Sequence, residues 1–142
     1  MAKDNMGRHL YEIAGNDFLR GYIVSALWST PFKDTDGEDK HLDDKYGPED
    51  LNDVTFEKAK ADCAEFKEKV GETLNAAYAL KPDYHESEAG HHFWLTRCGH
   101  GAGFWDNNNY GDAFERLSTV AQSFGSVDWE VTDDGKINQI GV

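Results

Sequence analysis

The sequence has few cysteines and no long apolar run. Its 142 residues include two cysteines, Cys63 and Cys98, which could pair only if the fold brought them together. No apolar stretch follows the positive charges near Met1, as it would in a secretory leader, so we expect a reduced, cytoplasmic protein. The most apolar stretch, Phe18 to Trp28, contains Arg20 and is shorter than the roughly 20 residues of a membrane-spanning helix. We therefore expect no membrane partner.

Positive charge is also scarce. Lys and Arg together number 14 against 27 Asp and Glu, which gives a formal net charge of −13. Affinity for nucleic acid depends on clustered Lys and Arg that neutralise phosphates, so we expect no direct nucleic-acid binding. The same charge steers the protein toward basic surfaces, including those with which other proteins hold DNA or RNA. Nucleic-acid mimicry is one hypothesis that this composition supports.

The apolar pattern indicates a single α+β domain over residues 1–142. Three stretches carry apolar residues at helical spacing: Asp17–Ser29, Thr55–Ala77 and Ala113–Phe124. Thr55 is the expected N-cap of the second helix, and Gly125 is expected to end the third in a left-handed conformation. Alternation over Phe93–Arg97 predicts a strand, and Val127–Ile140 predicts a C-terminal hairpin. We expect two N-terminal helices, a third helix and a small antiparallel sheet.

An acidic segment separates the first two predicted helices. Between Asp34 and Glu57, ten acidic residues stand against Lys40 and Lys45. This composition is typical of a solvated connector that like charges keep extended or mobile, and we place the connector at about residues 33–54. The alternative is an acidic contact surface. Its candidate residues are Asp34, Asp36, Glu38, Asp39, Asp43 and Asp44.

A glycine-rich turn follows the predicted strand. Three glycines alternate with His100 and Ala102, so the backbone can adopt positive φ, and its N–H groups can form an anion-binding nest. The run lacks the Lys-Ser/Thr pair of a Walker loop and the glycine spacing of a dinucleotide-binding motif. A tight connection between two strands accounts for the glycines equally well. The candidate binding residues are Thr96, Arg97, Gly99, His100, Gly101, Gly103, Trp105 and Asp106.

Arg97 and His100 give this turn its chemical interest. Arginine offers a planar fork to a carboxylate or phosphate, and histidine titrates near neutral pH, so a small-ligand or nucleotide-binding protein or an enzyme is an alternative. No nucleophile has a convincing base and no carboxylate pair has catalytic spacing, so we assign no catalytic residue.

Residue types that bind zinc also gather near the turn. They are His91, His92, Cys98, His100 and Asp106. A structural zinc site needs four converging ligands, and neighbouring histidines of a strand point to opposite faces. We therefore expect no metal ion or other cofactor.

The run Phe93–Asp106, Phe-Trp-Leu-Thr-Arg-Cys-Gly-His-Gly-Ala-Gly-Phe-Trp-Asp, resembles a family of small, uncharacterised proteins of tailed phages and prophages. The family pattern has Asn at the position of Cys98 and Asp at that of His92, so these two residues do not carry over. The resemblance implies a phage accessory gene acting in the cytoplasm of a bacterial host cell, without implying a particular activity. Further similar stretches, from Phe18 onward, are Phe18–Thr30, Leu42–Asp44, Ala61–Phe66 and Asp133–Lys136.

The charge and the resemblance together predict a small acidic phage-type accessory protein that binds a host macromolecule. The expected partner is a host protein with a basic surface, and the expected role is host modulation or anti-defence, including nucleic-acid (DNA) mimicry. The alternative function uses the Gly-His-Gly-Ala-Gly turn to bind a small ligand or to catalyse a reaction.

Overall fold

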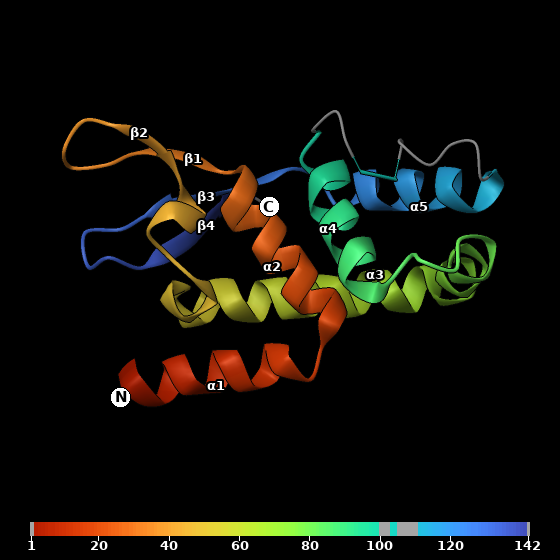
Figure 1. The fold of residues 1–142 in the computed structure, drawn as a ribbon, viewed down its shortest axis with the longest axis horizontal. Coiled ribbons are helices and arrows are strands. Elements are labelled where there is room, and N and C mark those ends of the chain that lie inside the picture. Colours follow the sequence, from red (N-terminus) through yellow and green to blue (C-terminus); the bar gives the residue numbers. More distant parts are fainter. Residues whose placement is uncertain (1, 100–102, 105–110, 142) are drawn as a thin grey trace.

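A computed structural model describes residues 2–99, 103–104 and 111–141 (Figure 1). Within those residues the chain is α+β, as predicted, and it ends in an antiparallel hairpin. No helix in this part of the chain is both long and apolar enough to cross a membrane. The elements are α1 (Ala2–Ala14), α2 (Asp17–Ser29), β1 (Pro31–Lys33), β2 (Asp39–His41), the 3₁₀ turns η1 (Leu42–Asp44) and η2 (Pro48–Asp50), α3 (Asp53–Leu80), α4 (Glu86–Arg97), α5 (Asp112–Ser123), β3 (Val127–Val131) and β4 (Ile137–Gly141).

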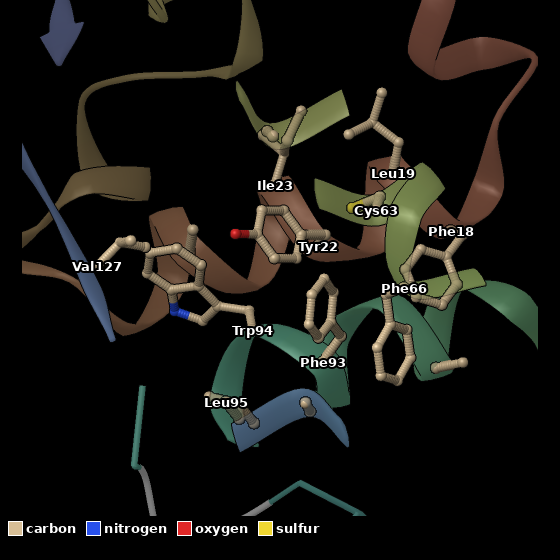
Figure 2. Packing of buried hydrophobic residues seen from close by; sticks show 14 of the residues in the cluster. Phe18, Leu19, Tyr22, Ile23, Cys63, Phe66, Phe93, Trp94, Leu95 and Val127 are labelled. Carbon is tan, nitrogen blue, oxygen red and sulfur yellow. The ribbon is translucent and has the colours of Figure 1, made fainter. Parts of the chain in front are cut away.

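Helix α2 lies at the centre of the core and spans the residues predicted for it. Asn16 caps the helix, because its side-chain oxygen accepts a hydrogen bond from the backbone N–H of Leu19 (3.1 Å). The helix contacts α1, α3 and α4. The buried Tyr22 ring lies 5.3 Å from the ring centroids of both Phe93 and Trp94 of α4 (Figure 2). The large aromatic side chains of the two helices therefore form one continuous core.

Helices α2 and α4 approach each other through their backbones. A Cβ added to Gly21 would collide with the carbonyl group of Ser87, and one added to Gly90 would collide with that of Phe18. Glycine is required at both positions because any side chain would hold the helices apart. This close approach brings the aromatic rings of α2 and α4 into contact.

The strand predicted at Phe93–Arg97 is wrong, because these residues form the last turns of α4. Alternation over five residues is too short to distinguish a strand from a helix that is buried over much of its circumference. The longer pattern is helical, since Ala89, Gly90, Phe93 and Arg97 are all buried. Two glutamates in the first turn and an arginine in the last also complement the helix dipole.

Helix α3 begins two residues before its predicted N-cap. Its N-cap is Asn52, which accepts a hydrogen bond from the backbone N–H of Thr55 (2.8 Å). The Thr55 hydroxyl instead accepts the backbone N–H of Gln139 in β4 (2.7 Å), so it ties the helix to the C-terminal hairpin. The backbone leaves the helical region at Val70 (φ −123°, ψ 22°), which kinks the helix just before Gly71.

The end of the chain matches the prediction closely. Helix α5 stops next to Gly125, whose φ of +78° is the expected left-handed conformation. The turn between β3 and β4 contains Gly135, also at positive φ (+77°). Within the hairpin, the buried Trp129 indole N–H donates to Gln139 Oε1 (3.1 Å), which satisfies its polar atom.

Two parts of the fold are absent from the prediction. No helix is predicted before Asp17, yet the structure contains α1, which the buried side chains of His9 and Ile13 anchor. The acidic segment expected as a connector contains the end of β1, all of β2 and both 3₁₀ turns. Leu42 and Leu51 are buried in the core, which explains how so acidic a stretch is held against the domain.

Substituting Gly90 should destabilise the fold through a steric clash between α2 and α4. We expect Gly90→Ala to lower the free energy of unfolding by about 2 kcal/mol or more, because the new methyl group cannot fit against α2. Gly7→Ala in α1 is the matched control, since its Cβ meets no atom within 4 Å, and it should stabilise by about 0.5–1 kcal/mol through helix propensity. Urea unfolding measures both, and equal effects would contradict the close contact.

Candidate functional site

Arg97, the central residue of the predicted binding turn, lies inside the protein with 4% of its surface exposed. Its Nη1 donates to the Tyr22 hydroxyl (3.1 Å) and to Asp62 Oδ2 (2.7 Å). Its Nε and Nη2 donate to the backbone carbonyls of Gly125 (2.9 Å) and Phe124 (3.1 Å). The guanidinium thus joins α4 to α2, α3 and the α5–β3 connection. Its donors point into the fold and away from any external anion.

The surroundings of Arg97 are suited to a buried charge. Asp62 supplies the opposite charge, while burial raises the pKa of Tyr22 despite the opposing effect of Arg97. Tyr22 is therefore a neutral hydroxyl at physiological pH. The guanidinium carbon lies 5.7 Å from the ring centroids of both Phe93 and Phe124, within cation–π distance. The charge is paired and hydrogen-bonded, as burial demands.

Thr96 is also buried, and its hydroxyl lies against the last glycine of the glycine-rich turn. Its hydroxyl oxygen accepts a hydrogen bond from the backbone N–H of Phe104 (3.1 Å). Gly103 has a φ of +119°, and a Cβ at this position would collide with the Thr96 hydroxyl. Glycine is therefore needed at 103 both for its backbone conformation and for this close approach.

The remaining residues of the predicted turn fall into two groups. Gly99 adopts the predicted positive φ (+75°), and its missing side chain faces open space. His100, Gly101, Trp105 and Asp106 lie outside the described residues. An acid–base or anion-binding group that pairs Arg97 with His100 therefore stays a prediction.

His91 and His92 do not lie on opposite faces of a strand, because both belong to α4, with ring centroids 5.9 Å apart. His92 Nδ1 is hydrogen-bonded to the Tyr84 hydroxyl (2.7 Å), and His91 lies 5.6 Å from the ring of the exposed Trp28. Burial lowers the pKa of His91, with Glu88 opposing the change. Both histidines line an open groove of about 440 Å³ between α2 and α4. The other lining residues are Arg20, Gly21, Val24, Ser87 and Glu88.

Neither cysteine has the environment of a reactive thiol. Burial raises the pKa of Cys63 well above its ordinary value and also raises that of Cys98, whose Sγ donates to the Val127 carbonyl oxygen (3.4 Å). A thiolate is the nucleophile and the metal ligand, so these shifts disfavour both roles. In the part of the chain that the structure describes, no three His, Cys, Asp or Glu side chains converge on a metal position.

The acidic segment is built around Asp34. Only 8% of its side chain is exposed, and it accepts hydrogen bonds from Lys40 Nζ (2.8 Å) and Lys45 Nζ (3.0 Å). These two ammonium groups, with the backbone N–H of Thr35, hold the pKa of Asp34 far below its ordinary value. Asp44 also has a structural role, since it accepts the backbone N–H of His41 (2.9 Å) at the start of η1.

The other predicted acidic residues face solvent. Asp36 accepts the backbone N–H of Glu38 (2.9 Å) and is about half exposed. The Asp39 side chain is 89% exposed and lies 3.6 Å from Lys33, and Glu38 and Asp43 are also exposed. The β1–β2 and β3–β4 hairpins extend toward the same end of the molecule (Figure 1). We call Asp36, Glu38, Asp39 and Asp43 the acidic hairpin surface.

A small cavity of about 190 Å³ was not foreseen from the sequence. We call it the His9 cavity, and it is lined by His9, Glu49, Leu51, Asn52, Asp53, Asp134 and Lys136. These residues come from α1, η2, the start of α3 and the β3–β4 turn, which are far apart in the chain. No local sequence pattern could reveal a cavity that such distant segments form. The helical periodicity of α1 is the one local signal that could have drawn attention to His9, the only histidine of that helix.

Comparison of the chain with protein-family models, with curated proteins and with solved structures finds no match.

Removing the buried guanidinium should unfold the protein more readily. We expect Arg97→Ala to lower the free energy of unfolding by about 3 kcal/mol or more, because it leaves Asp62 and two backbone carbonyls without their donor. Arg97→Lys should rescue little, since one ammonium group cannot reach four separated acceptors. The exposed Arg116 provides the control, and Arg116→Ala should change stability by less than about 0.5 kcal/mol. Chemical denaturation compares the three variants.

The contribution of Asp34 to the stability of the folded protein should decrease as the pH falls. Because its folded-state pKa is lowered, the stabilisation is present above the ordinary Asp pKa of about 4 and is lost as the pH falls below it. Asp34→Asn should therefore lower the melting temperature at pH 7, and the difference from wild type should shrink progressively at more acidic pH. Asp43→Asn, at an exposed site in the same segment, should show little effect at either pH. A pH-independent difference would contradict the lysine pairing.

Proposed function

We propose that this protein binds a macromolecule with a basic surface through the acidic hairpin surface. The observation that carries the proposal is that the most acidic part of the chain is a built element. Asp34 is clamped by two lysines, and Asp44 caps η1. A segment that served only as a solvated connector would not require these internal hydrogen bonds.

The order of the hairpin supports binding in a specific way. Because Asp34 and Asp44 hold the backbone, the exposed carboxylates are presented at fixed positions. A surface that is already ordered loses less conformational entropy on association than a mobile acidic tail. The net charge of −13 adds long-range attraction that speeds the encounter with a positively charged partner.

The partner that best fits this chemistry is a bacterial host protein with a basic surface, including a surface that normally holds DNA or RNA. The resemblance to small proteins of tailed phages and prophages supports an accessory role in the host cytoplasm, such as blocking a defence system. The alternative, ligand binding or catalysis at the glycine-rich turn, draws less support, because the donors of Arg97 are engaged within the fold.

Neutralising the acidic hairpin surface should abolish partner capture without unfolding the protein. The test variant is Asp36→Asn/Glu38→Gln/Asp39→Asn/Asp43→Asn, which keeps Asp34 and Asp44. The control removes the same amount of charge from exposed acids elsewhere, as Glu65→Gln/Glu68→Gln/Glu72→Gln/Asp83→Asn. Each immobilised protein is exposed to bacterial lysate, and a host protein should be retained by wild type and the control but lost from the test variant.

Adding salt tests whether the capture is electrostatic, and adding nucleic acid tests whether the partner uses a nucleic-acid-binding surface. Capture should weaken steeply between about 50 and 300 mM NaCl, because exposed charges are screened. A partner that uses a nucleic-acid-binding surface should also be displaced by duplex DNA or RNA. Equal loss of capture in the test and control variants would show that only total charge matters, and salt-insensitive capture would contradict the electrostatic mechanism.

A further inference from the structure

The pairing of the β3–β4 hairpin determines which backbone groups face outward. In the described part of the chain, β3 pairs with β4 alone. The backbone N–H of Thr132 donates to the carbonyl oxygen of Lys136 (2.8 Å) next to the turn. Hydrogen-bonded and non-hydrogen-bonded pairs alternate along an antiparallel ladder. The backbone N–H and C=O groups of Val127, Trp129 and Val131 therefore point away from β4.

The outer edge of β4 is covered by the segment that leads into α3. The backbone N–H of Asn52 donates to the carbonyl oxygen of Ile137 (2.9 Å), and the Thr55 hydroxyl accepts the N–H of Gln139 (2.7 Å). Leu51 also forms a parallel bridge with Ile137. The chain itself thus satisfies this edge of the hairpin.

The outer edge of β3 is satisfied only at its beginning. Cys98 Sγ donates to the carbonyl oxygen of Val127 (3.4 Å), and Asp128 Oδ1 accepts the backbone N–H of Trp129 (2.9 Å). Within the described residues, the C=O of Trp129 and the N–H and C=O of Val131 make no hydrogen bond. Three outward-facing backbone groups are therefore available to another strand.

The chain leaves space beside the first residues of this edge. A cavity of about 230 Å³ lies between the start of β3 and the start of β1, and Pro31, Val127 and Asp128 are among its lining residues. From this cavity the two hairpins extend toward the same end of the molecule (Figure 1). The edge thus begins next to the strand that leads into the acidic hairpin surface.

The solvent-exposed side chains of β3 are acidic. Asp128 and Glu130 are exposed and alternate with the buried Trp129 and the half-buried Val131, which pack against the core. Glu130 accepts a hydrogen bond from Asn138 Nδ2 (3.2 Å), and among the described residues neither carboxylate forms an ion pair with Lys or Arg. Side chains of an added strand would alternate between these carboxylates and the core side.

An extended, basic polypeptide segment fits this edge best. An added strand satisfies the free backbone groups of an edge strand, and opposite charges on adjacent strands attract each other. A second copy of this chain, paired through the same edge, would bring its own Asp128 and Glu130 beside these carboxylates. Like charges on adjacent strands destabilise the pairing. The acidic face of β3 therefore disfavours self-association and favours a segment with Lys or Arg at alternate positions.

We infer that the outer edge of β3 receives an extended segment of the partner in which basic residues alternate with apolar ones. The backbone of this segment bonds to the C=O of Trp129 and to the N–H and C=O of Val131. Its basic side chains lie beside Asp128 and Glu130, and its apolar side chains lie on the side of Val131. This inference rests on the proposed function for the basic character of the occupant, and it adds backbone hydrogen bonds to a broad electrostatic attraction.

A short peptide tests the inference without the partner. The probe is Ac-Lys-Val-Lys-Val-Lys-NH₂, titrated at low salt into the full-length protein while the backbone amide signals are followed by NMR. We expect a saturable shift of the Val131 amide signal. At saturation this amide should exchange with solvent about tenfold more slowly or slower still, because it gains a hydrogen bond. The amide of Asp83, in an exposed loop after α3, should not respond.

Two control peptides separate backbone pairing from charge attraction. The first is the probe with every backbone amide N-methylated, which keeps the side chains and the charge but cannot donate. The second is Ac-Lys-Lys-Lys-Val-Val-NH₂, which keeps the composition but lacks the alternation. Both should bind about tenfold more weakly than the probe. Equal binding of the N-methylated peptide, or no response of Val131 to the probe, overturns the inference.

Variants then test the charge pairs. Asp128→Asn/Glu130→Gln should weaken binding of the probe about tenfold, because it removes two opposite-charge pairs. It keeps the side-chain oxygens that accept hydrogen bonds within the hairpin, and a melting temperature close to that of wild type checks the fold. The control Glu68→Gln/Asp83→Asn removes the same charge from exposed positions elsewhere and should bind the probe nearly as wild type does. Equal losses in the two variants contradict the assigned contacts.

The two proposals fail in different ways. If capture of a host protein survives neutralisation of the acidic hairpin surface while the probe still protects the Val131 amide, the proposed function fails and the strand site stands. If capture depends on the acidic hairpin surface but the probe leaves Val131 unchanged, the strand site fails alone. Where both hold, Asp128→Asn/Glu130→Gln should also weaken capture of the partner.

Discussion

The buried guanidinium of Arg97 is the interaction on which the rest of the structure depends. It reaches the Tyr22 hydroxyl in α2, Asp62 in α3 and two carbonyl groups at the end of α5, while its own backbone belongs to α4. Four helices are thus held at one charged centre inside an aromatic core. Such a centre is costly to bury and tolerates no missing partner, so it specifies the relative placement of these elements.

The buried position of Arg97 gives the Thr96-Arg97 and glycine motif a structural role within the fold. A Thr-Arg pair followed by glycines looks like a binding turn because arginine and glycine are common where anions bind. In the folded chain Thr96 and Arg97 face inward, and Gly103 is needed to let the backbone pass the Thr96 hydroxyl. The exposed carboxylates near β1 and β2, which carry the proposed function, lie outside this centre.

Much of the fold could be predicted where the signal was local. Helix α2, the stop of α5 at Gly125 and the β3–β4 hairpin follow from periodicity and turn chemistry. Helix α4 could not be identified from five alternating residues, because its burial on several sides erases the polar face that marks a helix. The acidic carboxylates were predicted as a possible surface, but the lysine clamp on Asp34 was not, since pairing across a hairpin depends on register. The His9 cavity joins four distant segments and has no local signature.

The backbone contact between α2 and α4 affects how sequence variation in relatives of this protein should be interpreted. Gly21 and Gly90 are fixed by the distance between two helix axes, so their invariance would report a steric limit. The same holds for Arg97, whose neighbours are all internal. Among such relatives the most constant positions would therefore trace the folding core, and constancy at Gly21, Gly90 or Arg97 would not by itself mark a binding site.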